Sequence, residues 1–591
     1  MSKDTVDGER IRRTETLRRR PGPGLASVIL LAGLACSDAG SGPTIPPDEV
    51  VPEPELPRAV ACDGDTVAPV PMSRLGATAY ERALRSLLGD EAIDAIAPIM
   101  AIYRPVAIGP YDSHLGPASA AEVEAQLEIG SAAAMAVMAR PSARARVLPC
   151  LVDIETKDDS SVKACAHALA EHLGARALRR TLQPEDLERF LSGQTIGAAD
   201  GVVDGFVTLM STILIDPEFH YFMEFGTNDG QSRLSSGEAA ARLARILWDD
   251  LPDEQLMAAA AANFVAPDWD AEVDRVWAEP RTRQALARFA HDWLALDDMP
   301  LPLSAWSPTS DGRIALRLAA IREVQTFFTD SVVDRGGTYA DLLLDPTARI
   351  ANPELASIYG VVADANNPVM LPREKGRAGL LTRVGWLATP AIPGTNAGHL
   401  VRRGEHLSRF LCDEIPPPNP NVVGVIQPLN TRETPEESLR DRFARLTGEA
   451  PCKGCHATLE AHGAPFGHHG AMGEWIDREQ NRVTGSAPRE VEITTAAQVD
   501  IDGERVSVDS APALSEQIAR SSAGPRCLVE QIVQRLYGRE LQPSDRCLVD
   551  RLTQTLSPAD GGEPGSIENL VKLALKSPEF WHRAAVTMEA P

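Results

Sequence analysis

The stretch "SSGEAAARLARILWDDL" (residues 235–251) indicates how most of this chain is built. Ser235 and Glu238 match the S-x-x-E pattern of a capping box, in which both side chains accept hydrogen bonds from free backbone N–H groups at a helix start. Leu243 and Leu247 then follow at a spacing that places apolar side chains on one helix face. The stretch therefore predicts an amphipathic helix packed on a core.

The same periodicity recurs along much of the chain. Strand-like alternation is weak except near residues 491–508, where Asp502-Gly503 is typical of a hairpin turn. We therefore expect a mainly α, multidomain helical protein with a small β-hairpin. The other helical stretches are 75–89, 160–180, 268–296 with a break near Pro280, and 314–335.

Length and charge restrict the protein class. A chain of 591 residues is too long for one core, so several domains are expected. The formal net charge is −25, and such a body is repelled by phosphate backbones. We therefore expect no nucleic acid among its partners.

The N-terminal segment indicates export. "LRRRPGPGLASVILLAGLAC" joins a basic region to an apolar run, Leu25–Ala35, that is too short to span a bilayer. The run ends at Cys36 and resembles a bacterial lipoprotein signal, although Gly33 stands where a leucine is usual. We expect a lipid anchor on Cys36 at the periplasmic face of a membrane. Without lipidation, cleavage at the small residues before Cys36 gives a periplasmic or secreted protein.

Six further cysteines lie outside Cys36 and the pair discussed below, an even number that predicts three disulfides in an exported chain. Cys150 and Cys165 flank a polar loop, and Cys527 and Cys547 lie on two expected helices joined by a short loop. Both pairings are therefore local, with buried free thiols as the alternative. A third pair, Cys62 with Cys412, follows only by elimination.

The chemistry-bearing stretch is "PCKGCHATLEAHGAPFGHHGAMGEW" (451–475). Cys452, Cys455 and His456 form C-x-x-C-H, the attachment pattern of a c-type haem. Two thiols three residues apart can each form a thioether with a haem vinyl group, and the next histidine can bind iron as the proximal ligand. The motif predicts haem c as the cofactor, with no metal ion other than haem iron.

Zinc is the main alternative at this stretch. Cys452, Cys455 and His456 with His468 or His469 could supply four zinc ligands, but the second histidine of a two-Cys, two-His finger is missing. For haem, the candidate distal ligands are Met472, His468 and His469, with a ligand elsewhere or an open position as alternatives.

Several segments resemble the planctomycete and myxobacterial type of cytochrome c-like multidomain proteins, built from domains of unknown function. The similarity is carried by "RLSSGEAAARLARILWDDLPDEQL", "RAGLLTRVGWLA", "VRRGEHLSRFLCDEIPPPNPNV" and "CLVEQIVQRLYGREL". The resemblance implies export, helical domains and a haem domain, but no settled activity. After C-x-x-C-H, this chain has a histidine-rich glycine loop where the family usually has an aromatic, carboxylate-bearing run.

The patterns suggest a division of the chain into seven parts. We expect a lipoprotein-type signal sequence at 1–36, a Pro-rich tether at 37–70, helical domains at 71–140, at 141–230 with Cys150 and Cys165, and at 231–365, a cytochrome c-like haem-binding domain at 370–485, and a C-terminal helical domain at 486–591 with Cys527 and Cys547.

The predicted function is electron transfer through one covalently bound haem, with a redox partner protein, as part of a larger oxidoreductase or envelope system. A haem-dependent oxidoreductase and a non-enzymatic envelope binding protein with a structural haem or metal remain alternatives. No catalytic residue stands out. Asp249, Asp250 and Asp253 beside Trp248 are interpreted as a solvated helix end.

Overall fold

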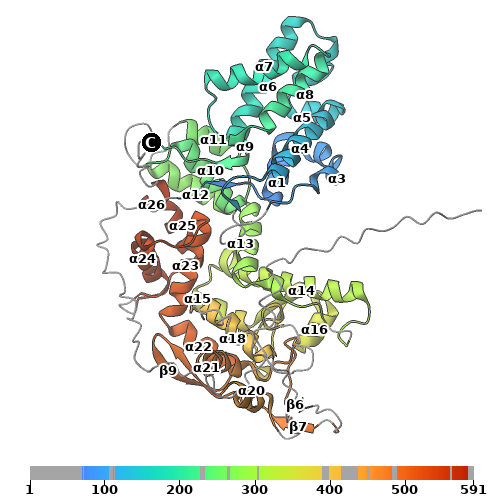
Figure 1. The fold of residues 1–591 in the computed structure, drawn as a ribbon. Helices are drawn as coiled ribbons and strands as arrows, with labels where there is room; N and C mark the ends of the chain where they lie inside the picture. The colour runs from blue at the N-terminus through green and yellow to red at the C-terminus, as the bar shows by residue number, and fades with distance from the viewer. Residues whose placement is uncertain are drawn as a thin grey trace, which may run out of the picture.

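The computed structural model is mainly helical, with 65% helix and 9% strand, which confirms the predicted fold class (Figure 1). The predicted signal sequence and the tether up to residue 69, with Cys36 and Cys62, lie outside the described residues. The structure describes residues 70, 72–105, 111, 114–226, 233–262, 266–302, 305–388, 398–413, 415, 437–448, 452–481, 487, 489–558 and 562–582.

Helix α10 (Ser236–Trp248) forms as the opening stretch predicts. Ser235 and Glu238 make both hydrogen bonds of the capping box, and Leu243 and Leu247 are buried. The helix ends at Asp249, whose φ of 54° is in the left-handed region that stops a helix. Local capping and periodicity are therefore sufficient to define this element.

The N-terminal helices gather at one end of the molecule around a core of their own, drawn blue to cyan (Figure 1). This core contains buried residues from Leu75 to Leu251. Its helices are α1 (Ala77–Leu88), α2 (Asp90–Asp94), α3 (Ala97–Met100), α4 (Ala120–Met138), α5 (Pro141–Val147), α6 (Asp159–Leu178), α7 (Pro184–Gly197), α8 (Val202–Leu214) and α9 (Pro217–His220).

A second core holds together most of the rest of the described chain, with buried residues from Leu234 to Phe580. The predicted domains 231–365, 370–485 and 486–591 all contribute to it, while their boundaries stay a prediction. The helices in this part are α10, α11 (Glu254–Ala261), α12 (Ala266–Ala278), α13 (Pro280–Trp293), α14 (Ser310–Thr329), α15 (Tyr339–Leu344), α16 (Pro353–Tyr359), α17 (Val384–Leu387), α18 (Gly398–Phe410), α20 (Leu439–Thr447), α21 (Lys453–Gly463), α22 (Ala511–Arg520), α23 (Ala523–Tyr537), α24 (Arg546–Leu556), α25 (Ile567–Lys576) and α26 (Pro578–Trp581).

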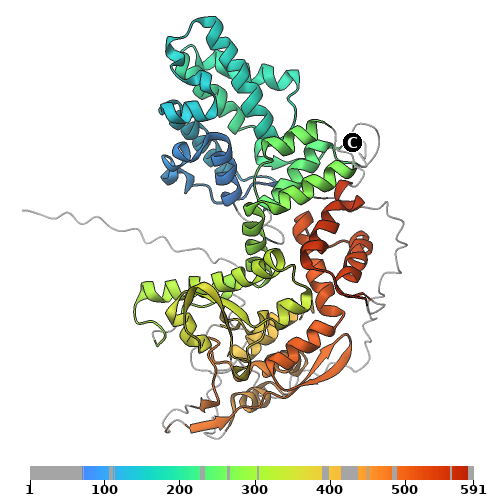
Figure 2. The same cartoon turned by 180° about the vertical axis from the view of Figure 1, so that it is seen from behind.

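The C-terminal helices return to the start of this second core and lie beside α12 and α13 (Figures 1 and 2). The Arg242 guanidinium on α10 donates to the Phe580 carbonyl at 2.6 Å. The Trp269 indole N–H on α12 donates to the Leu575 carbonyl at 3.0 Å. These contacts join residues more than 300 positions apart in the sequence.

The strands form small antiparallel sheets. The predicted hairpin is confirmed, because β8 (Ala497–Ile501) pairs with β9 (Glu504–Val508) around Asp502-Gly503. The other pairings are β1 (Ser73–Arg74) with both β2 (His114–Leu115) and β3 (Tyr221–Phe222), β4 (Thr347–Ile350) with β5 (Asp364–Met370), and β6 (Arg478–Asn481) with β7 (Arg489–Glu492).

The disulfides correct two of the three predicted pairings. Cys150 and Cys165 are bonded as predicted, but Cys527 on α23 is bonded to Cys412 at the end of α18. The predicted pairs Cys527–Cys547 and Cys62–Cys412 are therefore wrong, although Cys547 is also disulfide-bonded. The physical reason is that Cys527 is buried where α23 packs against α18, so its neighbour comes from a distant helix.

No helix in the described part of the chain is both long enough and apolar enough to cross a membrane.

Acid is expected to destabilise the N-terminal core through His220. Its Nε2 lies 2.9 Å from the Leu214 carbonyl, its Nδ1 is buried without a partner, and burial lowers the pKa of His220 to about 4. Between pH 6.5 and about 4, His220 is protonated in the unfolded chain and neutral in the folded chain. Acidification through this range therefore lowers the free energy of unfolding by about 3 kcal/mol, and this contribution is fully present above pH 6.5. Urea unfolding at several pH values measures this loss.

The matched variants are His220→Gln and His167→Gln, the latter at a half-exposed side chain. We expect the pH dependence over this window to shrink in His220→Gln and to persist in His167→Gln. Equal pH dependence in both variants and in the wild type would contradict the assignment to His220.

Candidate functional site

The C-x-x-C-H residues lie on the first turn of α21. Cys452 is the N-cap residue, with a helical φ of −81° and ψ of −32°. The His456 backbone N–H donates to the Cys452 carbonyl at 3.2 Å and closes this turn. Cys455 lies between them on the same turn, so the structure brings together the three residues that the sequence singled out.

His456 occupies a half-buried position against an aromatic ring. Its imidazole makes an edge contact with Phe443 of α20, with ring centroids 5.2 Å apart. Phe443 itself packs with Leu400 and Leu439 in a small apolar cluster. Burial lowers the pKa of His456, which favours the neutral imidazole that binds metals. Its Nδ1 is buried and has no hydrogen-bond partner among the described residues.

Helix α21 is held by a close crossing with α18. A Cβ at Gly404 would lie 2.1 Å from the Leu459 carbonyl oxygen, and a Cβ at Gly463 would lie 2.0 Å from the Leu400 carbonyl oxygen. Both distances are far below van der Waals contact, so only glycine permits the two backbones to approach this closely. The crossing fixes the helix that begins with the motif.

The two motif cysteines differ in state. Cys455 is a free thiol at a half-buried position, whereas Cys452 is buried and disulfide-bonded. A thioether needs a free thiol, so attachment of haem at Cys452 requires this disulfide to be reduced first. The structure therefore presents one motif thiol directly and the other in oxidised form.

The candidate distal ligands His468, His469 and Met472 lie in different surroundings from those of His456. The His468 ring stacks on Trp475 at 4.8 Å, and the His469 ring contacts the same indole edge-on at 5.8 Å. Met472 is 2% exposed and belongs to the second core. Among the described residues, no hydrogen bond or ring contact joins His456 to these three side chains, and no three His, Cys, Asp or Glu side chains gather to hold a metal ion.

Arg403 binds the histidine-rich loop from α18. Its guanidinium donates to the Leu387 carbonyl at 3.0 Å, to the Phe466 carbonyl at 3.2 Å, and to the carbonyls of His469 and Gly470 at 2.6 and 2.5 Å. Burial lowers the pKa of Arg403 to about 9. This arginine therefore supplies hydrogen bonds to four backbone carbonyls inside the core.

Arg377 fixes the end of the same loop. It donates to the Gly473 carbonyl at 2.6 Å and to the Thr382 carbonyl at 2.7 Å. Gly473 has a φ of 77°, a conformation that side chains disfavour. The backbone of this loop is therefore held by two arginines that lie 60 or more positions away, so the sequence near the loop could not indicate its conformation.

The interpretation of Asp249, Asp250 and Asp253 as a solvated helix end is wrong. Asp249 pairs with Arg82 at 3.1 Å, and Asp250 is buried enough that desolvation raises its pKa. Asp253 caps α11 and is paired as well. Asp249 and Asp250 line a cavity together with arginines from distant segments, which local spacing could not reveal.

Two segments of the chain match models of known protein families. Residues 234–361 match the family PSD4, described as a protein of unknown function (DUF1592). Residues 377–479, which include the C-x-x-C-H motif, match the family PSCyt3, described as a protein of unknown function (DUF1588). No curated protein and no solved structure matches the chain. The two matched families are domains of unknown function known in planctomycete cytochrome c-like proteins, and the two matching segments follow one another in this chain.

Proposed function

We propose that this protein is an exported mono-haem c-type protein that transfers electrons. The observation that carries the proposal is the single helical turn that holds Cys452, Cys455 and His456. The hydrogen bond from the His456 N–H to the Cys452 carbonyl keeps the three residues of the motif on one helical turn. The families matched by the chain support the same reading, since they are known in cytochrome c-like proteins.

The chain's own residues have distinct roles in this proposal. Cys452 and Cys455 would hold haem c through thioethers, and the neutral His456 would donate its lone pair to iron. Haem supplies one-electron chemistry when bound. Phe443 restricts the rotation of the His456 ring, and the glycine crossing keeps α21 in place on α18. A formal net charge of −25 favours a basic redox partner through electrostatic steering.

Export and anchoring belong to the same proposal. Covalent haem attachment takes place outside the cytoplasmic membrane, and the predicted signal sequence would carry the chain there. Cys36 would then hold a lipid anchor at the periplasmic face.

The deciding experiment is expression with haem-maturation machinery, followed by a pyridine haemochrome assay and a haem stain of denatured protein. We expect about one covalent haem per chain in the wild type, attachment through one thioether in Cys455→Ser, and none in the double variant Cys452→Ser with Cys455→Ser. Cys547→Ser, which also alters a disulfide-bonded cysteine, is the matched control and should keep its haem. Wild-type protein without covalent haem would overturn the proposal.

A second candidate is a haem-dependent oxidoreductase that binds an external ligand. It is favoured by the packing of His468, His469 and Met472, because all three are engaged away from His456. An iron face without a protein ligand permits ligand binding. A carbon monoxide shift in the spectrum of the reduced protein supports this candidate, and an unchanged low-spin spectrum supports simple electron transfer.

A further inference from the structure

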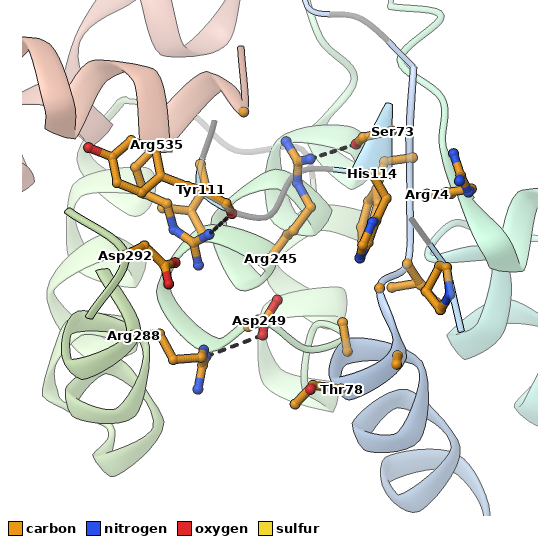
Figure 3. A pocket seen from close by; sticks show the side chains of 18 of the residues that line it. Ser73, Arg74, Thr78, Tyr111, His114, Arg245, Asp249, Arg288, Asp292 and Arg535 are labelled. Atoms are coloured by element: carbon orange, nitrogen blue, oxygen red, sulfur yellow. Dashed lines mark hydrogen bonds and ion pairs between the residues drawn. The ribbon is translucent and has the colours of Figure 1, made fainter. Parts of the chain in front are cut away.

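A cavity of about 570 Å³ lies between the N-terminal strands and the second core. One wall is formed by the segment from Ser73 to Ala79 with His114 and Phe222. The other wall is formed by α10, α13 and α23, and Figure 3 shows the polar side chains around the space between them. The volume is in the range of sites for small organic molecules.

Three arginines from the three helices line this cavity: Arg245, Arg288 and Arg535 (Figure 3). Arg245 donates to the Ser73 hydroxyl at 2.7 Å, and its Nε is buried without a partner. Arg535 donates to the Tyr111 carbonyl at 3.2 Å. Neither of these acceptors is a carboxylate, so neither hydrogen bond offsets the positive charge of the guanidinium. Each guanidinium also has further N–H groups that can donate.

Arg288 also has buried N–H groups without a hydrogen-bond partner in the described part of the chain. Its Nη2 lies 3.4 Å from the Asp249 carboxylate, and both Nε and Nη2 are buried without a hydrogen-bond partner among the described residues. Asp249 meanwhile accepts a hydrogen bond from Arg82 at 3.1 Å, so its charge is shared between two arginines.

The remaining acidic side chains of the cavity do not balance these charges. Asp250 pairs with Arg281 at 3.3 Å, and Asp297 contacts Arg317. Asp292 also lines the cavity and acts on Arg288. A fourth arginine of the wall, Arg74, is matched by Glu122 at 2.9 Å. The charge of Glu224 also acts on Arg245, but Glu224 is paired with Arg242. Among the described residues, Arg288 alone of the three cavity arginines forms an ion pair with a carboxylate, that of Asp249.

The electrostatic consequence is a locally positive cavity in an acidic protein. Burial is the main cause that lowers the pKa of Arg245 and of Arg288 to about 10. The charge of Arg242 adds to this effect at Arg245, that of Arg82 adds to it at Arg288, and that of Arg535 adds to it at both. Buried like charges are costly unless an opposite charge offsets them. An anion between them would relieve this repulsion and satisfy the unpaired N–H groups.

We infer that this cavity binds a small organic oxyanion, carrying carboxylate or phosphate groups, between Arg245, Arg288 and Arg535. Phe222 and Ile246 give the ligand an apolar surface. His114 adds a further polar group, since it is 6% exposed and its Nδ1 has no partner among the described residues. The inference does not depend on haem binding at α21.

Calorimetric titration of the full chain at low ionic strength tests this, with pyrophosphate and citrate as the two probes. We expect saturable binding of at least one probe, and the tighter one identifies phosphate or carboxylate as the preferred group. Arg535→Met should weaken binding by about tenfold to a hundredfold, because it removes a charge-assisted hydrogen bond. Arg520→Met removes the same charge from a side chain that is 71% exposed, and it should bind as the wild type does.

Two variants of Arg288 distinguish a loss of binding from a folding defect. Arg288→Lys retains the charge at the cavity and should bind more tightly than Arg288→Met. Absence of binding of both probes to the wild type overturns the inference, as does equal affinity in Arg535→Met and Arg520→Met. Near-ultraviolet circular dichroism of each variant confirms that the native fold is retained before titration.

Discussion

Replacing Glu323 with alanine is expected to lower the free energy of unfolding of the second core by about 3–5 kcal/mol. Glu323 accepts a hydrogen bond from the Arg383 guanidinium at 2.5 Å, and the side chains are 1% and 0% exposed. The Tyr359 hydroxyl donates to the other carboxylate oxygen at 2.9 Å. The substitution leaves a buried guanidinium without its counter-charge and a buried hydroxyl without its acceptor, which accounts for the size of the effect.

Removing both charges should cost less than removing one. In the double variant Glu323→Leu with Arg383→Met, no uncompensated charge stays in the core, although the bonds from Arg383 to the Asp345 and Thr347 carbonyls are lost. Urea unfolding followed by tryptophan fluorescence measures both variants. The comparison requires the same transition in each, because a chain with two cores need not unfold in one step.

An exposed ion pair provides the matched control. Glu516→Ala removes a carboxylate 3.7 Å from Arg520, where both side chains are at least half exposed, and we expect a loss below about 1 kcal/mol. A loss of that small size in Glu323→Ala as well would contradict the assigned role of the buried pair.

The contrast between these two pairs indicates which features a sequence can predict. The helix that begins at Ser236 and the hairpin at Asp502-Gly503 depend on residues within a few positions of one another, and both were predicted. The turn that holds Cys452 and His456 is equally local. The Arg383–Glu323 pair joins residues 60 positions apart, and nothing near either residue identifies its partner.

The same distinction between local and distant partners applies to the candidate site. The attachment motif could be predicted, because its spacing is set by one helical turn. The loop of His468 and His469 could not, since its conformation depends on hydrogen bonds from Arg403 and Arg377 on other elements. The cavity arginines were missed for the same reason, as Arg245 on α10 and Arg535 on α23 are far apart in the sequence and line one cavity only in the folded chain.

Removal of the Cys412–Cys527 disulfide is expected to have the second large effect on the free energy of unfolding. It joins residues 115 positions apart and links α18 to α23. In the chain-entropy treatment, a cross-link that closes a loop of about 100 residues stabilises a fold by about 4–5 kcal/mol. The double variant Cys412→Ser with Cys527→Ser should therefore lose about that much unfolding free energy in the transition of the second core.

The Cys150–Cys165 disulfide is the natural comparison, because it closes a separation of only 15 residues in the N-terminal core. Its removal should cost about 3 kcal/mol and shift the other transition. Non-reducing peptide mapping tests the pairing itself, independently of stability. We expect one cross-linked fragment that contains Cys412 and Cys527. A fragment that joins Cys527 to Cys547 would contradict the pairing of Cys527 with Cys412 that the structure shows.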